Sequence, residues 1–363
     1  MTKRSFLSHA DAAELNRNLV LNYVKNLGPV SRTDIWESIN LSRASVTHII
    51  RQLQDMDLIL EIGEGESSGG RRPLQLLSNK DARLLYVFDW VTSSISLLNI
   101  GGEILYRTVL SFPRNCTPNT FAHIVMQGLN KIENEVTVDK KKLLGLGLSM
   151  PGQIDNRNCI LLYSVELGWR DVNIASLFAD CFKHRVFLER TANMMALGEY
   201  TYGAAKNVNH VLMVQLSRDG IGCSLIIRGN CQHGSNYMVG ELGHIKLFNS
   251  NVTCSCGQVG CLEAVVNDCL LHNGNVIDSK IINYISMGIA AVVNVMDPQM
   301  VILSGNLIFE ISEKQMNEFK AKIRSNVTNE RSRKLDILVS EDYENMVIKG
   351  MCAYIFNECF SIA

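Results

Sequence analysis

One histidine and three cysteines lie close together in a glycine-rich segment of the second half of the chain. Cys254, Cys256 and Cys261 follow His244 at ten, twelve and seventeen residues. Zinc prefers four nitrogen and sulfur ligands in a tetrahedron, and four protein ligands leave no open position for a reactive water. The spacing therefore predicts a structural Zn²⁺ site, which can form only if this segment folds back on itself. Isolated buried thiols and a core histidine are the alternative.

Two glutamates flank this set, Glu241 before it and Glu263 after it. Carboxylates accept hydrogen bonds from hydroxyl groups. If His244 binds the metal through one ring nitrogen, the other nitrogen carries a proton and can donate to a hydroxyl as well. We therefore expect a polyol-binding site beside the metal. Alternatively, these three side chains serve the metal site alone.

The composition is that of a globular protein with a large core. The chain has 363 residues, of which 47% are hydrophobic and 20% are charged, so two or three domains are expected. No run of about 18 apolar residues is present, and no apolar stretch follows Lys3 and Arg4, which argues against membrane insertion and a signal peptide. Eleven cysteines, an odd number, fit the reduced thiols of a cytoplasmic protein. A net charge of −1 provides no general attraction to nucleic acid.

The first eighty residues contain three helical patterns. Apolar residues repeat at helical spacing from Glu14 to Leu27, and Gly28-Pro29 ends that helix. Ser31 and Ser42 are suited to cap two further helices, and the second of these has an apolar stripe at i, i+3, i+4 and i+7. Its other face is rich in hydrogen-bonding groups, as a helix that contacts DNA bases and phosphates must be. The DNA-contacting residues expected here are Ser42, Arg43, Ser45, Thr47, His48 and Arg51.

Two strands, 58–62 and 74–77, are expected after these helices, joined by a glycine-rich tip that contains Arg71 and Arg72. Such a tip can lie against a DNA backbone, and the whole segment is typical of a winged helix-turn-helix. Residues 1–80 hold ten Lys or Arg against nine Asp or Glu, so DNA binding would depend on where the charges lie. A small helical subdomain with a solvated polar face is the alternative.

The remaining residues alternate between strands and helices. Strands are expected at 84–88, 95–99, 103–110, 143–149, 211–217 and 221–228, and helices at 118–135 and 280–296. Alternation of this kind builds α/β layers, and two comparable blocks predict two lobes. Ligands of such folds bind in a cleft where strand ends meet.

Four sequence blocks occur in the order and spacing of a known family. They are 146–155 with Pro151-Gly152, Leu167-Gly168-Trp169, 196–199, and 240–263 with the proposed metal ligands. In these blocks the chain resembles the ROK family, which unites sugar kinases and sugar-responsive repressors, and its N-terminal segment resembles that of the repressors. The resemblance implies a winged helix-turn-helix domain at 1–80, followed by a two-lobed actin-like (ribonuclease-H-like) ROK body at 81–363.

The residues that a ROK kinase needs for phosphoryl transfer are not kept. Kinases of the family hold phosphate with Asp-x-Gly-Gly-Thr after the first strand, where this chain has Asp89-Trp90-Val91-Thr92-Ser93. Their second loop, Gly-Thr-Gly-Ile-Gly, corresponds to Arg218-Asp219-Gly220-Ile221-Gly222. Their Asn-Asp pair, which binds sugar and supplies the general base, corresponds to Arg190-Thr191, and threonine cannot accept a proton at neutral pH. Glu189 is the nearest carboxylate that could replace the base.

These features predict a DNA-binding transcriptional regulator, a repressor of carbohydrate genes, that binds a palindromic operator as a homodimer or a dimer of dimers. The resemblance places a sugar or sugar-phosphate effector among Gly152, Arg190, Thr191, Glu241, His244 and Glu263. The Arg190 guanidinium favours an anionic sugar, unless it pairs with Glu189 or Glu199. A ROK sugar kinase with an appended DNA-binding domain, and a repressor controlled by a sugar-transport protein, are the alternatives.

Overall fold

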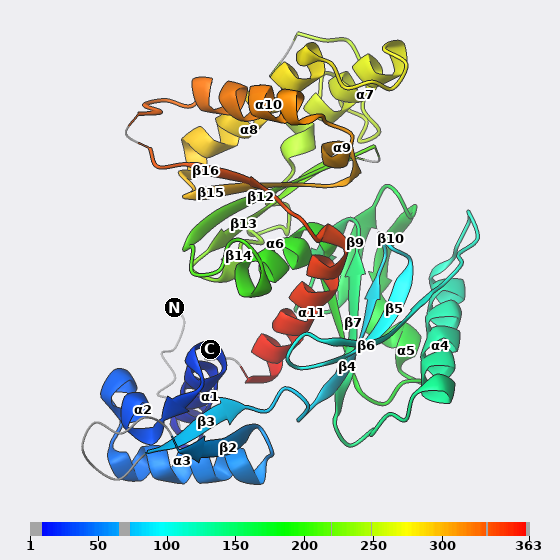
Figure 1. Cartoon of the computed structure of the whole chain (residues 1–363). Coiled ribbons are helices and arrows are strands. Elements are labelled where there is room, and N and C mark those ends of the chain that lie inside the picture. Colours follow the sequence, from blue (N-terminus) through cyan, green and yellow to red (C-terminus); the bar gives the residue numbers. More distant parts are fainter. Residues whose placement is uncertain (1–8, 65–72, 219, 248, 332, 361–363) are drawn as a thin grey trace, which may run out of the picture.

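The computed structural model describes residues 9–64, 73–218, 220–247, 249–331 and 333–360. A small N-terminal unit lies beside a larger body, and the body consists of two lobes that each contain one five-stranded sheet (Figure 1).

The N-terminal unit combines helices with a short antiparallel sheet of order β1-β3-β2. Its elements are α1 (His9–Leu27), β1 (Val30–Ser31), α2 (Arg32–Ile39), α3 (Arg43–Asp55), β2 (Ile59–Glu64) and β3 (Leu74–Ser78). Ser31 forms a capping box with Asp34, and Ser42 Oγ accepts a hydrogen bond from the Ser45 amide, so both expected N-caps are confirmed. α1 begins before the expected Glu14, because the preceding segment is rich in alanine, the strongest helix former.

The first lobe contains a sheet of order β11-β7-β4-β5-β6. Its strands are β4 (Leu84–Asp89), β5 (Ser94–Asn99), β6 (Ile104–Val109), β7 (Leu143–Met150) and β11 (Arg185–Arg190). Strands β4, β5 and β6 form an antiparallel meander, and β7 and β11 extend it in parallel. The helices are α4 (Pro118–Glu135) and α5 (Ile174–Phe178), and a small second sheet contains β8 (Gln153–Asp155), β9 (Ile160–Ser164) and β10 (Trp169–Asn173).

The second lobe repeats this topology with the order β14-β13-β12-β15-β16. Its strands are β12 (His210–Ser217), β13 (Gly220–Ile227), β14 (Asn230–Cys231), β15 (Met300–Ser304) and β16 (Asp336–Val339). Its helices are η1 (Leu242–His244), α7 (Leu262–His272), α8 (Ser279–Met296), α9 (Asn306–Phe309) and α10 (Glu313–Ser325). Here too an antiparallel meander is extended by two parallel strands, which confirms the two comparable blocks expected from the sequence.

Two helices, α6 (Thr191–Tyr202) and α11 (Tyr343–Phe360), cross each other between the sheets. Each follows the last strand of one sheet. Their backbones touch at two glycines: a Cβ on Gly198 would lie 2.0 Å from the Met346 carbonyl oxygen, and one on Gly350 would lie 1.7 Å from that of Met194. Only glycine allows this approach.

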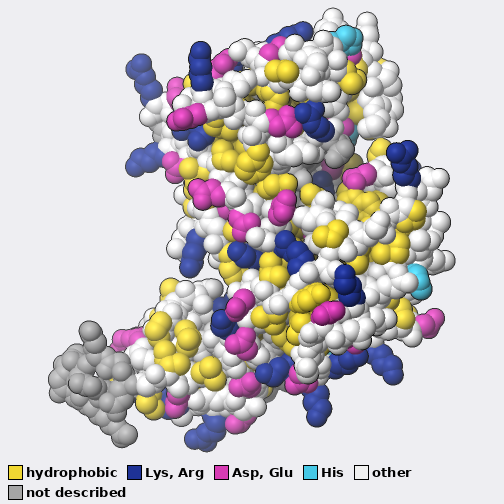
Figure 2. Space-filling view, turned by 45° about the vertical axis from the view of Figure 1, so that its right-hand side comes forward, with side chains coloured by type: hydrophobic (Ala, Val, Ile, Leu, Met, Phe, Trp, Pro, Cys, Tyr) yellow, Lys and Arg dark blue, Asp and Glu magenta, His cyan; other side chains and the backbone are white. Residues whose placement is uncertain are grey.

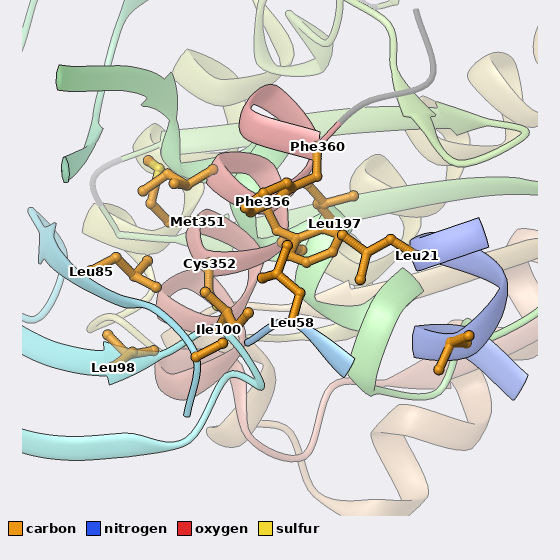
Figure 3. Packing of buried hydrophobic residues seen from close by; sticks show 14 of the residues in the cluster. Leu21, Leu58, Leu85, Leu98, Ile100, Leu197, Met351, Cys352, Phe356 and Phe360 are labelled. Carbon is orange, nitrogen blue, oxygen red and sulfur yellow. The ribbon is translucent and has the colours of Figure 1, made fainter. Parts of the chain in front are cut away.

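The N-terminal unit packs onto α11 and the first lobe through one continuous hydrophobic cluster. In this cluster Leu21 and Leu58 lie close to Phe356 and Phe360 of α11 (Figure 3). The ammonium of Lys25 lies 3.4 Å from the centroid of the Phe356 ring. Helix α11 therefore extends from the region between the lobes to the N-terminal unit.

Among the described helices, α8 is long and apolar enough to cross a membrane by length and composition alone. Polar residues such as Asn283 interrupt it, and its buried side chains, among them Ile281, Ile285 and Ile289, belong to the core of the second lobe.

Candidate functional site

A cleft of about 640 Å³ is lined by residues of both lobes. The first lobe contributes the ends of its parallel strands, and the second contributes the loop between β12 and β13, η1 and the start of α7. The six residues that the sequence placed around an effector all line this cleft: Gly152, Arg190, Thr191, Glu241, His244 and Glu263.

The local structure accounts for Gly152 and Thr191, two of these six residues. Gly152 has φ +117°, and a Cβ there would lie 2.4 Å from the Tyr163 carbonyl oxygen. Thr191 is the first residue of α6, at the end of β11, and its buried Oγ1 accepts a hydrogen bond from Ser149 Oγ at 3.0 Å. At this position, where the resemblance to ROK kinases implies the catalytic base, the chain therefore has a neutral hydroxyl that already accepts a hydrogen bond.

Arg190 is paired within the protein. Its Nη1 donates to the Val239 carbonyl at 2.6 Å, and its Nη2 donates to Glu241 Oε1 at 2.9 Å. The ion-pair partner among the described residues is thus Glu241, not Glu189 or Glu199 as considered from the sequence. Because the Glu241 carboxylate compensates the charge of the guanidinium, Arg190 attracts an anionic ligand less strongly than a free arginine would.

Glu189 lies on the other side of β11 from the cleft. Its carboxylate is fully buried, accepts hydrogen bonds from the side chains of Asn156 and Asn193, and contacts His233 Nε2. It lines a separate cavity of about 800 Å³. Burial alone would lower the pKa of His233, but the hydrogen bond to Glu189 raises it above its ordinary value. Glu189 therefore faces this second cavity and is not among the residues that line the cleft.

The two loops that the resemblance compares with the phosphate-binding loops of ROK kinases make hydrogen bonds to carboxylates of this chain. Asp89 is buried, which raises the pKa of its carboxyl group, and Oδ2 accepts hydrogen bonds from the amide and hydroxyl of Thr92. In the second loop, the Ile221 amide donates to Glu263 Oε2 at 2.9 Å. A backbone amide that could contact phosphate is therefore already bound to a carboxylate. Asp219 lies outside the described residues.

The ligand atoms of His244, Cys254, Cys256 and Cys261 lie within 4.8 Å of one another. The Cys256 and Cys261 sulfurs are 3.8 Å apart, and Cys254 Sγ is 3.6 Å from His244 Nδ1. A tetrahedron with Zn–S bonds of about 2.3 Å and a Zn–N bond of about 2.0–2.1 Å has S–S edges of about 3.8 Å and S–N edges of about 3.5–3.6 Å. The residues present thus fit one tetrahedral metal ion, and this cluster connects η1 to the start of α7.

The other ring nitrogen of His244, Nε2, lies 3.6 Å from Glu241 Oε2, and His244 also lines the cleft. A chain of contacts runs from the cysteine cluster through His244 and Glu241 to Arg190. The cluster of His244 and the three cysteines and the cleft therefore share one set of side chains.

On α3, Arg43, Thr47, His48 and Arg51 are exposed. Arg43 stacks on the Trp36 ring, with 4.3 Å between the guanidinium carbon and the ring centroid. The hydroxyls of Ser42 and Ser45 hydrogen-bond to each other at the helix start, so both are part of the cap. Arg71 and Arg72 lie outside the described residues. Basic and acidic side chains are interspersed over the lobes in the view of Figure 2.

Several cleft residues were not singled out from the sequence. They are aromatic or polar side chains far apart in the chain: Trp90, Phe112, Gln215, Asn306 and Tyr343. Trp90 was noted only as an obstacle to phosphate. Phe112 and Tyr343 belong to segments without a motif, so only the folded chain brings them together.

Fold and site together define a two-lobed α/β protein with a ligand-sized cleft beside a cluster able to hold a metal ion. A model described as the ROK family matches residues 92–275, and the chain belongs to this family.

Among curated proteins, a xylose repressor of Bacillus spizizenii is 28% identical over 96% of this chain and 97% of its own length. The DNA-binding transcriptional dual regulator NagC of Escherichia coli is 24% identical over 81% of both chains. Among solved structures, a ROK family transcriptional regulator described as a homolog of E. coli MLC has a TM-score of 0.79 at 20% identity and covers 97% of both chains. A ROK hexokinase from Thermus thermophilus has a TM-score of 0.61 at 22% identity, covering 76% of this chain and 99% of its own.

Proposed function

We propose that this protein is a sugar-responsive transcriptional repressor. A winged helix-turn-helix domain, residues 1–80, binds operator DNA, and the ROK body, residues 81–363, binds the effector. The proposal depends on the residues that line the cleft. Glu241 and Glu263, whose carboxylates can bind hydroxyl groups, are present. At the position of the catalytic base the chain has Thr191, which is hydrogen-bonded to Ser149. A solved structure described as a ROK family transcriptional regulator matches 97% of this chain, which supports the same conclusion.

DNA recognition is assigned to α3. Its exposed face can enter the major groove, where Arg43, Thr47, His48 and Arg51 reach bases and phosphates. Ser42 and Ser45 hold the start of the helix, and Arg71 and Arg72 extend the contact to the DNA backbone at the wing. Two such helices read a palindromic operator when the chain forms a homodimer or a dimer of dimers. A DNA-binding repressor of this kind acts in the cytoplasm.

Phosphoryl transfer is not part of the proposal. The hexokinase likeness concerns the fold of the body. In this chain the base is absent, Glu189 faces another cavity and Glu263 holds the Ile221 amide. Sugar-dependent ATP hydrolysis is therefore expected to remain at background.

The four-residue cluster is assigned to one structural Zn²⁺ bound by His244 Nδ1 and the three cysteine sulfurs. A closed site of this type supplies folding free energy and no open coordination position. Its effect here is to hold η1 and the start of α7, and hence Glu241 and Glu263, at the cleft.

The effector is a sugar or a sugar phosphate that contacts Gly152, Arg190, Thr191, Glu241, His244 and Glu263. The Arg190–Glu241 ion pair favours a neutral sugar, because a phosphate would compete with a carboxylate that is already in place. Control by a sugar-transport protein is the second candidate, favoured by the loss of two sugar contacts of the family at Arg190 and Thr191.

Selection of binding sites from random duplex DNA tests the assignment of α3. A palindrome should be recovered, and Arg51→Ala should weaken binding to it by about 1–3 kcal/mol if Arg51 contacts a base. Lys314→Ala, which alters an exposed side chain on α10 of the second lobe, is the matched control and should not change DNA binding. Recovery of the same palindrome with undiminished affinity by Arg51→Ala would contradict the assignment.

A further inference from the structure

The cleft between the lobes is lined by different side chains at its two ends, because Arg190 ends β11, Trp90 follows β4, and β7 lies between these strands in the sheet. The end at Arg190 has the charged side chains of Arg190, Glu241 and Glu263. The end at Trp90 has the Trp90 and Phe112 rings, and Arg114, Glu166 and Leu167 of the first lobe also line the cleft. A kinase would place phosphate at the loop after β4, but this chain places aromatic surface there.

The aromatic end is held in a fixed geometry. The Trp90 indole N–H donates to Glu166, which also lines the cleft. The rings of Trp90 and Phe112 are tilted by 39° with centroids 5.5 Å apart, and both rings contact Phe121. Phe121 itself is fully buried. The two cleft-lining rings are thus supported from behind by the core of the first lobe.

A preorganised aromatic wall suits one face of a sugar ring. The C–H groups on that face carry small positive charges, and the face of an aromatic ring is negative. The cleft volume of about 640 Å³ is within the range of about 300–1,000 Å³ for pockets that enclose drug-sized ligands. The cleft therefore has room for a ring at each end.

We propose that the effector is a saccharide of at least two rings, one bound at the charged end and the next stacked on Trp90 and Phe112. This inference rests on the proposed function, in which a sugar is the effector. It explains why bulky side chains stand in the former phosphate loop: a saccharide needs an apolar surface there, whereas phosphate needs bare backbone amides.

Calorimetric titration of three matched pairs tests the inference: xylose and xylobiose, glucose and cellobiose, and N-acetylglucosamine and its β-1,4-linked dimer. At least one disaccharide should bind about tenfold more tightly than its monosaccharide. Trp90→Ala should weaken binding of that disaccharide about tenfold and change monosaccharide binding by less than about twofold. Phe112→Ala gives a second test of the same surface should Trp90→Ala fail to fold.

Phe182→Leu is the matched control, because it removes an aromatic ring that packs against the core of the first lobe but does not line the cleft. It should leave the preference for the disaccharide intact. The inference is overturned if monosaccharides bind as tightly as disaccharides, or if Phe182→Leu and Trp90→Ala have equal effects. Operator affinity is measured with each sugar: release by a monosaccharide alone overturns only this inference, whereas no response to any saccharide overturns the sugar effector as well.

Discussion

At the scale of single residues, the charged side chains at the cleft form ion pairs and hydrogen bonds within the protein. Glu241 links Arg190 to His244, and Glu263 holds the Ile221 amide. Motifs predicted which residues meet at the cleft. They could not predict the pairing of Arg190 with Glu241, because it depends on which way a strand-end side chain points and on how closely the second lobe approaches.

The metal cluster gives a prediction at this scale. Cys256→Ser should remove zinc and lower the thermal unfolding temperature, because a closed site contributes folding free energy directly. Elemental analysis should find one zinc per chain in the wild type and in Cys181→Ser, which alters an exposed cysteine outside the cluster. A zinc-free Cys256→Ser protein with wild-type stability and ligand binding would show that the metal does not support the cleft.

Lys25 gives a second prediction. Burial lowers the pKa of its ammonium to about 8, from 10.5 for the free side chain. The unfolded chain therefore holds this proton more tightly than the folded one between these values, so the destabilisation caused by Lys25 should shrink as pH increases from about 8 to 10.5. Lys25→Met should stabilise the protein by about 1–2 kcal/mol at pH 7, and this difference from the wild type should decrease over the same pH range. Denaturant unfolding of both proteins across this range measures the difference, with Lys314→Met as an exposed control; a difference that does not change with pH would refute the explanation.

At the scale of secondary-structure elements, the sequence was informative wherever hydrophobic spacing and caps determine the structure. The capped helices α2 and α3, the meander of β4 to β6 and helix α8 follow the expected ranges closely. The crossing of α6 and α11 was not foreseen, because a glycine in a helix does not reveal which backbone will approach it. The close approach of α11 explains why a glycine stands at position 198, which belongs to one of the family blocks.

This crossing can be tested. Gly198→Ala should destabilise the protein by about 1–3 kcal/mol or more, because its Cβ would meet the Met346 carbonyl oxygen at 2.0 Å. Gly222→Ala is the control, since a Cβ there meets no atom within 4 Å. Equal unfolding free energies for the two variants in urea would mean that α6 and α11 separate at little cost.

At the scale of the whole molecule, α11 connects the two functions. Tyr343, its first residue, lines the cleft, and Phe356 and Phe360 near its other end pack against the N-terminal unit. A ligand that prefers one arrangement of the lobes can thereby change the position of α3. Neither this connection nor the aromatic end of the cleft could be derived from the sequence, since both depend on packing between segments far apart in the chain.

Operator binding in the presence and absence of saccharide, measured by fluorescence anisotropy alongside ATP hydrolysis, tests the central claim most directly. We predict that an active saccharide lowers operator affinity about tenfold or more, that operator DNA lowers saccharide affinity by the same factor, and that ATP hydrolysis stays at background. A tenfold change corresponds to about 1.4 kcal/mol of coupling between the two sites. Operator affinity that no saccharide alters, or sugar-dependent ATP hydrolysis well above background, would contradict the account.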